Sequence, residues 1–172
     1  MKKQLIAVVS ALAMTFMSLP CVSIATENVP KPVVQYTFDG NKQLADQNGK
    51  NELKLSGGAS VTDDGNKGKG LLLDGTDGYA ELPDNILSSD MTITTWVKIN
   101  KFTTWGRVFD FGTDSNQNFF FAPYSGGASR VEIKNGATVD TMDCTQETAK
   151  DWVNYAITIK GDTVHITETA DL

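Results

Sequence analysis

Cysteine and histidine are scarce in this sequence: Cys21, Cys144 and His165 are the only ones among 172 residues. We expect Cys21 to be removed with an N-terminal leader, which leaves one cysteine and excludes a disulfide within the mature chain. Cys144 has no base or second thiol nearby in sequence, so we interpret it as structural rather than reactive. His165 has no matching acid, and a lone strand histidine is more often structural or exposed than catalytic.

Basic residues are also few, because 15 lysines and arginines stand against 21 aspartates and glutamates, for a net charge of −6. This balance argues against a nucleic-acid partner and against an anionic membrane surface. Lys67, Lys69 and the glycines around them invite comparison with a phosphate loop, but no Gly-Lys-Ser/Thr and no helix follow them. That segment is therefore predicted to be a solvated hairpin.

The first 25 residues have the pattern of an export signal. Two lysines precede an uncharged apolar stretch, Leu5 to Leu19, and small residues up to Ala25 fit a signal peptidase site. The apolar stretch is shorter than the ~20 residues of a spanning helix, and Pro20 ends it, which argues against a membrane anchor. Cys21 leaves a lipoprotein alternative, which Pro20 directly before it fits poorly. We predict a signal peptide over residues 1–25 and a secreted, extracellular protein with no membrane contact after cleavage.

Residues 26–32 are predicted to form a short linker containing proline, and residues 33–172 amount to one domain. No long helical periodicity follows the leader, whereas β-branched and aromatic residues alternate in short stretches between Gly, Asn and Asp turns. Two Asp-Gly pairs, at Asp74 and Asp77, mark a sharp reversal, and Asn135-Gly136 marks a hairpin. We expect strands at residues 33–38, 52–55, 59–62, 71–73, 79–82, 91–99, 107–111, 119–124, 130–134, 152–159 and 163–167.

Alternation along these strands assigns side chains to faces. Ile93 and Val97 share one face of their strand, and Val131 and Ile133 are expected to point inward. The three consecutive phenylalanines from Phe119 to Phe121 place rings on both faces. At least one of those rings therefore cannot enter a core between sheets.

Three stretches carry a family resemblance: LLLDGTDGYAELP, then MTITTWVK, then WGRVFDFG. In this order and at this spacing they resemble the laminin-G-like, concanavalin A-like jelly roll, in the secreted bacterial form that often accompanies glycoside hydrolases. The resemblance runs from about Val33 to the C-terminus. It implies an all-β fold, a two-sheet antiparallel jelly-roll sandwich, and says less about chemistry, because this fold carries many functions.

The resemblance also implies that the domain is incomplete at its C-terminal end. In the family, two or more strands follow the one that matches Thr163 to Thr167, and the last of them pairs beside the first strand. No such motif follows in this sequence. We therefore expect the family's last strands to be lacking and the mature chain to be unstable, dimeric or prone to aggregation on its own.

Aromatic residues at presumed rim and strand-end positions suggest a carbohydrate site. Sugar rings stack on aromatic side chains, while polar neighbours bond to the hydroxyl groups. The candidate ligand-binding residues are Trp105, Phe120, Tyr124 and Arg130. The alternative is that Trp105 and Phe120 close the core, as we expect of Trp96 and Trp152, which both lie inside alternating strands.

Polar residues of the first loop suggest a structural calcium (Ca²⁺) site. Calcium takes six or more oxygen ligands, often from loop carboxylates and carbonyls. In the family the corresponding loop often surrounds calcium, and its polar positions match Asp39, Asn41, Asp46 and Asn48. Ordinary turn chemistry is the alternative, since Asn and Asp favour turns in any case. The family's C-terminal Asp ligand has no match here.

No catalytic constellation emerges from these residues. A Glu-x-Asp-x-x-Glu strand, which jelly-roll glucanases use, is absent, and Glu132 stands alone on its strand. We predict a secreted, non-catalytic module that binds carbohydrate or another ligand, accessory to polysaccharide degradation. Two alternatives stay open: an extracellular adhesion or protein-interaction module, and the N-terminal part of a larger glycoside hydrolase. The residues specify no oligomeric state.

Overall fold

The computed structural model describes residues 31–146 and 150–170. The chain divides into two compact units, Met1–Lys31 and Pro32–Leu172. Almost all of the first unit lies outside the described residues, and so do the expected signal peptide, its cleavage site and most of the linker. The strands and the candidate site all belong to the second unit.

All regular secondary structure of the described residues is β. No helix able to cross a membrane occurs among them. The strands are β1 (Lys54–Ser56), β2 (Ser60–Gly65), β3 (Gly68–Leu72), β4 (Tyr79–Glu81), β5 (Met91–Lys98), β6 (Phe109–Asp114), β7 (Gln117–Ala122), β8 (Ala128–Asn135), β9 (Thr138–Thr145), β10 (Trp152–Lys160) and β11 (Thr163–Ala170).

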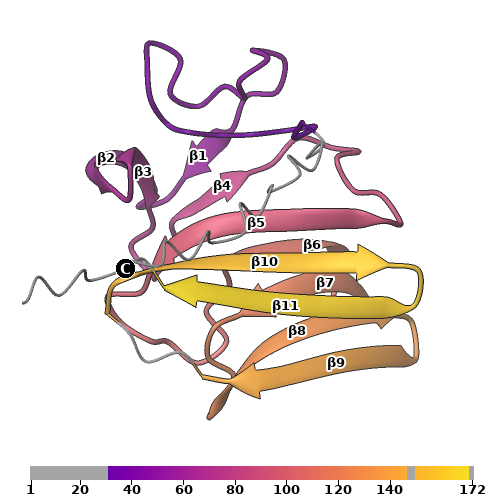
Figure 1. Ribbon diagram of the computed structural model, residues 1–172. Coiled ribbons are helices and arrows are strands. Elements are labelled where there is room, and N and C mark those ends of the chain that lie inside the picture. The colour runs from indigo at the N-terminus through magenta and orange to yellow at the C-terminus, as the bar shows by residue number, and fades with distance from the viewer. Residues whose placement is uncertain (1–30, 147–149, 171–172) are drawn as a thin grey trace, which may run out of the picture. The chain divides into compact units, whose positions relative to one another are not determined.

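Two larger antiparallel sheets form the body of the unit (Figure 1). One has the order β11-β10-β5 and the other the order β6-β7-β8-β9. In the first sheet Ile157 lies between Ile93 and Ile166, and in the second Phe121 lies beside Val131. The predicted all-β, two-sheet antiparallel sandwich is therefore confirmed.

The core lies between these two sheets. Its buried cluster takes three side chains from each sheet: Phe119, Phe121 and Val131 from one, and Val153, Tyr155 and Ile157 from the other. The rings of Phe121 and Tyr155 are 4.8 Å apart between centroids, which is close contact for an aromatic pair. Ile93, Val97 and Ile133 pack against the cluster, so the predicted inward faces are confirmed.

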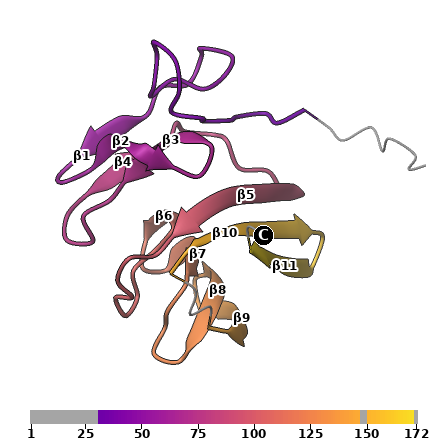
Figure 2. The ribbon, with the colours of Figure 1, turned by 60° about the vertical axis from the view of Figure 1, so that its left-hand side comes forward.

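Two short strand pairs, β2-β3 and β1-β4, lie together next to β5 in both views (Figures 1 and 2). The hairpin β2-β3 contains Lys67 and Lys69, the lysines that invite comparison with a phosphate loop. Lys69 forms an ion pair with Asp63 inside this hairpin, and Lys98 of β5 pairs with Asp64 at 3.3 Å. The segment is thus a hairpin, as predicted, and the ion pairs are an addition that the sequence did not show.

The two Asp-Gly pairs form the expected sharp reversal after β3. Asp74 Oδ1 accepts hydrogen bonds from the backbone N–H groups of Thr76, Asp77 and Gly78, and these bonds lower the pKa of its carboxyl. Across from this loop, a Cβ added to Gly57 would overlap the carbonyl oxygen of Asp77. Gly57 also has φ +57°, so both space and backbone conformation require glycine there.

The expected strand at residues 33–38 is wrong. These residues form no strand, and the Gln35 carbonyl accepts the N–H of Gln47 at 2.9 Å instead of entering a ladder. The rings of Tyr36 and Phe38 stack 6.5 Å apart, and Phe38 has φ +61°, a left-handed value far from that of a regular β-strand. Alternation of apolar residues alone does not make a strand, because a strand also needs a neighbouring strand with free backbone groups.

Other boundaries differ from the prediction for local reasons. The expected strand 107–111 is β6, which begins at Phe109 and continues through Gly112 to Asp114. It ends there because Asp114 Oδ1 accepts the N–H groups of Asn116 and Gln117 and so closes the turn. β9 is a strand that the sequence pattern does not single out, although the Asn135-Gly136 turn implies a partner for β8. The expected loss of the family's last strands stays a prediction.

Candidate functional site

The outer face of the four-stranded sheet collects most of the predicted ligand-binding residues. Because Phe119, Phe121 and Val131 point into the core, Phe120 and Arg130 point outward. In the register of the sheet, Arg130 lies opposite Asp143, and Phe120 lies between Asp110 and Glu132.

The segment before β6 brings Trp105 to this face. The backbone N–H of Trp105 donates to the carbonyl of Tyr124 at 2.9 Å, and the N–H of Val108 donates to the carbonyl of Phe121 at 2.9 Å. The segment therefore runs beside β7. Trp105 has φ +66°, a left-handed conformation that is a genuine outlier for a bulky residue. The following Gly106 closes a tight turn by donating to the carbonyl of Thr103.

The Trp105 indole stands half out of the surface, with 46% of the residue exposed. Its ring meets the ring of Phe120 edge to face, with centroids 6.4 Å apart and an interplanar angle of 83°. The Arg130 guanidinium lies 5.5 Å from the indole centroid, within the range of a cation–π contact. Trp105 therefore lies outside the core between the sheets and is fixed from two sides.

Phe120 is a support for this group and offers almost no surface of its own. It is only 2% exposed, although it points away from the core cluster. Trp105 meets one part of its ring, and the Arg107 guanidinium lies 4.1 Å from the ring centroid. The alternative that Phe120 closes the core between the sheets is thus replaced by a second, smaller packing site on the outer face.

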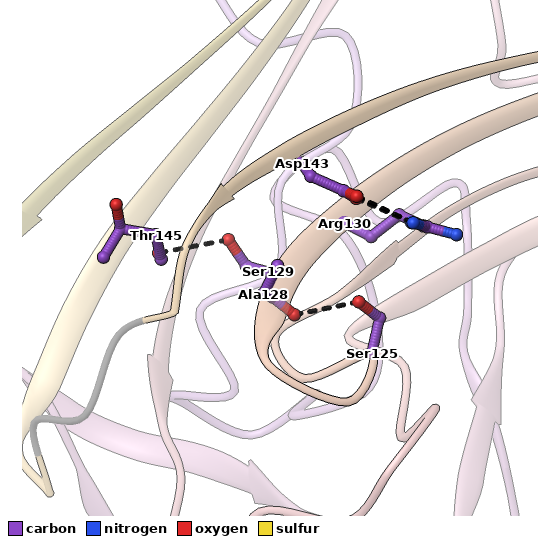
Figure 3. A network of polar contacts seen from close by, with 6 residues as sticks. All are labelled: Ser125, Ala128, Ser129, Arg130, Asp143 and Thr145. Atoms are coloured by element: carbon purple, nitrogen blue, oxygen red, sulfur yellow. Dashed lines mark hydrogen bonds and ion pairs between the residues drawn. The ribbon is translucent and has the colours of Figure 1, made fainter.

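Arg130 and Asp143 form a two-pronged ion pair across β8 and β9 (Figure 3). Arg130 Nε donates to Asp143 Oδ1 at 2.6 Å and Nη2 donates to Oδ2 at 2.7 Å. The side-chain hydrogen bond from Arg130 holds the pKa of the Asp143 carboxyl below its ordinary value, and the same bond raises the pKa of the guanidinium. The guanidinium is therefore held as a fixed cation in contact with the indole.

The turn before Arg130 is held by short polar contacts (Figure 3). The N–H and hydroxyl of Ser125 both donate to the carbonyl of Ala128, at 2.8 and 3.0 Å. Ser129 is fully buried and its hydroxyl donates to the carbonyl of Thr145 at 3.5 Å. These bonds tie the start of β8 to the end of β9 and so position the Arg130–Asp143 pair.

Arg107 and Asp110 form a second pair at this face, which sequence reasoning missed. Arg107 covers Phe120, and Asp110 lies opposite Phe120 in the ladder. The only sequence signal is the stretch WGRVFD itself, in which Arg107 and Asp110 are three residues apart. Their contacts with Phe120 depend on the register between β6 and β7, which the sequence alone does not give.

Tyr124 joins this site through its backbone rather than its ring. Its carbonyl accepts the N–H of Trp105, whereas its ring meets Phe102 edge to face at 6.3 Å. Of the four predicted residues, Trp105, Phe120 and Arg130 form one contact cluster, and Tyr124 anchors the segment that carries Trp105. We call Trp105, Arg107, Asp110, Phe120, Glu132, Arg130 and Asp143 the Trp105 face.

Trp96 and Trp152 do not lie in the core as expected. Their neighbours Val97 and Val153 point into the core, so both indoles lie on the outer side of the three-stranded sheet. Lys67 Nζ is 5.8 Å from the ring centroid of Trp96, and Lys98 Nζ is 6.0 Å from that of Trp152. The expectation is wrong because position inside an alternating strand does not tell which face is the core.

Asp46 organises the first loop, residues 39–51, through hydrogen bonds. The N–H groups of Lys50 and Asn51 donate to its Oδ1 at 2.8 and 3.2 Å, and Asn51 Nδ2 donates to Oδ2 at 2.8 Å. Burial alone would raise the pKa of this carboxyl, but these bonds, with one from the Asn48 backbone, outweigh burial and lower it. Both lone pairs of Oδ1 are used within the loop, so any contact of Asp46 with a cation would have to come from Oδ2.

The other predicted calcium ligands have different surroundings. Asp39 Oδ1 accepts the N–H of Lys69 at 3.0 Å and so contacts the start of β3. Asn41 and Asn48 are exposed. In the part of the chain that the structure describes, no group of three or more His, Cys, Asp or Glu side chains is arranged to hold a metal ion. Calcium binding stays a prediction.

A family model described as the Concanavalin A-like lectin/glucanases superfamily, of the laminin G type, matches residues 74–167. The chain belongs to this superfamily. The match contains every residue of the Trp105 face but none of the predicted calcium ligands.

One solved structure similar to this superfamily member is that of an S-layer domain-containing protein, residues 221–444, from Clostridium thermocellum ATCC 27405. The two chains are 25% identical, and the superposition has a TM-score of 0.55. It covers 78% of this chain and 67% of that chain. No curated protein matches the chain.

Proposed function

We propose that this chain is a non-catalytic, extracellular module that binds carbohydrate through the Trp105 face. The observation that carries the proposal is the Trp105 indole, 46% exposed and held in place by Arg130 and Phe120. An indole offers a flat apolar surface for the C–H face of a sugar ring, and fixed polar neighbours offer hydrogen bonds to its hydroxyls.

The backbone at Trp105 supports a functional role for this residue. Bulky side chains at positive φ cost about 1–3 kcal/mol and are concentrated at sites where geometry matters more than stability. At φ +66° Trp105 carries this cost, yet the indole is not used to fill the core between the sheets. A need to present the ring outward explains both facts.

The carboxylates of the face support binding rather than a reaction. Asp143 and Asp110 are each paired with an arginine, so neither is an obvious proton donor or nucleophile. A glycosidase needs two carboxyl groups in different protonation states on either side of the bond that breaks. We therefore propose that the module assists polysaccharide degradation or binds carbohydrate at a cell surface. The second role is consistent with the S-layer domain-containing protein of similar structure.

The test is a binding comparison between two exposed apolar residues of the same outer face. Trp105 and Val139 are both 46% exposed, and Val139 also lies on the outer face, since it pairs with Lys134. Binding of the wild-type chain, Trp105→Ala and Val139→Ala to a glycan array and to soluble polysaccharides in affinity gels is measured. We expect retardation of the wild type and of Val139→Ala, and its loss in Trp105→Ala.

Two results would contradict the proposal. Binding that survives in Trp105→Ala would place the ligand elsewhere, and capture of an extracellular protein without any glycan binding would favour the adhesion alternative. Circular dichroism shows whether Trp105→Ala is folded. If it is not, Arg130→Gln tests the contact with the ligand instead. That variant leaves the Trp105 backbone unchanged and removes a polar neighbour of the indole.

We propose separately that calcium binds at the first loop. The support is that Asn41 and Asn48 are exposed residues and that Asp39 has a second carboxylate oxygen besides the one that accepts the N–H of Lys69. Asp46 would contribute to such a site mainly by shaping the loop, because its Oδ1 is already used. No role in carbohydrate binding is assigned to the ion.

A further inference from the structure

We infer that the Trp105 face selects uncharged pyranose chains and discriminates against acidic ones, such as uronate polymers. This inference rests on the proposed function and names the ligand class of the same site. It comes from how the charges around the indole are paired.

The cations of the face are already neutralised by carboxylates of the chain. Arg130 donates to both oxygens of Asp143, and Arg107 pairs with Asp110. Glu132 adds a third carboxylate beside Phe120, and it acts electrostatically on Arg130. Two guanidinium groups thus face three carboxylates within one patch.

A carboxylate on the ligand would meet this patch unfavourably. Unless it replaced Asp143, a ligand carboxylate could reach only the Arg130 N–H groups that Asp143 leaves free, on a guanidinium whose charge is already paired in a matched fork. If it left the pair intact, it would lie next to Asp143, Asp110 or Glu132, and like charges brought together at an interface oppose binding. The net charge of the chain, −6, adds repulsion at longer range.

A neutral sugar meets the same patch favourably. Each oxygen of Asp143 accepts one N–H from Arg130 and keeps further acceptor capacity for a sugar hydroxyl. The exposed part of the indole remains for the C–H face of the ring. The ion pairs therefore act as fixed acceptors and do not need to open when the ligand binds.

The experiment uses polysaccharide pairs that differ in charge but share a backbone. Hydroxyethylcellulose is compared with carboxymethylcellulose, and methyl-esterified homogalacturonan with its de-esterified form, each by affinity electrophoresis of the full chain. For at least one pair the neutral member should bind about tenfold or more tightly than the acidic one at low salt. Raising sodium chloride from about 50 to about 500 mM should narrow the ratio, because salt screens repulsion.

A charge variant tests the cause. Asp110→Asn with Asp143→Asn should improve binding of the acidic member relative to the neutral one by about fivefold or more. Asp140→Asn is the matched control: it makes the same chemical change on β9 but pairs with the inward-facing Ile133, so it should leave the ratio unchanged. Single Asp143→Asn replaces the double variant if that one fails to fold.

Each outcome decides one of two claims. Equal or tighter binding of the acidic member in every pair that the wild type binds would overturn the inference and leave carbohydrate binding standing. An unchanged ratio in the charge variant, with or without salt, would also overturn it. If neither member of either pair binds, the inference fails, and the glycan array decides the proposed function separately.

Discussion

Arg130 lies 5.5 Å from the centre of the Trp105 indole and gives two hydrogen bonds to Asp143. The residue that contacts the exposed ring is thus itself fixed by the ladder between β8 and β9, where Arg130 and Asp143 are direct partners. Because the ring, the cation and the carboxylate come from three separate segments, their arrangement depends on the sheet. Changes at any of the three are therefore expected to affect binding more than stability.

Replacing Trp105 separates backbone strain from side-chain contact. Glycine accepts φ +66° without cost, whereas alanine does not, so Trp105→Gly should be about 1 kcal/mol more stable to unfolding than Trp105→Ala. Both variants should lose carbohydrate binding to the same extent, because both lack the indole. Urea unfolding and affinity electrophoresis of the two proteins provide the check. Equal stability of the two variants would show that the left-handed backbone at this position is not strained.

Acid should weaken the chain through the Arg130–Asp143 pair. The folded-state pKa of Asp143 lies below its ordinary value of 3.8, so its stabilisation is present above that value and is lost as pH falls through the folded pKa. Asp143→Asn should therefore be less stable than the wild type at neutral pH, and the difference should shrink as the pH falls below 3.8. Urea unfolding at several pH values measures this.

Arg130→Gln is the control for the acid effect, since it removes the partner that lowers the pKa of Asp143. In that background, Asp143→Asn should change stability little at any pH. A constant difference between wild type and Asp143→Asn across the acid range would show that the pair contributes nothing to folding.

Much of the fold follows from alternation and turn chemistry. The pattern from Met91 predicts a strand that ends at Ile99, and β5 ends at Lys98. Three phenylalanines in a row require rings on both faces, and the structure places Phe119 and Phe121 in the core and Phe120 outside it. These features depend on local periodicity, which a sequence displays directly.

The sequence predictions that were wrong share a physical cause: each concerned a feature that depends on a second segment of the chain. Residues 33–38 alternate well but find no ladder, and Trp96 alternates well but faces outward. The contact between Trp105 and Arg130 joins residues on different segments, and it exists only because Trp105 is hydrogen-bonded to Tyr124 beside β7. Long-range register is not contained in local periodicity, so the residue types could be selected but their contacts could not.

The first loop offers a test of hydrogen bonding against calcium. Asp46→Ala should lower the melting temperature by a similar amount in calcium and in chelator, because its carboxylate binds backbone and side-chain donors of the loop. Asp46→Asn should be intermediate, since it keeps one acceptor oxygen. Thermal unfolding of all three proteins in both buffers is the measurement. Destabilisation that appears only in calcium would instead make Asp46 part of the predicted cation site.

Two glycines at positive φ should differ strongly in their tolerance of alanine. Gly136 has φ +63° in the turn between β8 and β9, and nothing lies near the place of an added Cβ. Gly136→Ala should therefore cost about 1 kcal/mol, which reflects the backbone conformation alone. Gly57 has a similar φ of +57°, but a Cβ there would overlap the backbone of Asp77.

Gly57→Ala should consequently cost about 3 kcal/mol or more, since the loop from Asp74 to Gly78 would have to move. That loop resists movement because Asp74 holds three of its N–H groups and Gly58 donates to Asp77 at 3.0 Å. Urea unfolding of the two alanine variants beside the wild type gives the comparison. Similar losses in both would mean that β1 and β4 separate at little cost and that the reversal after β3 is not a rigid part of the domain.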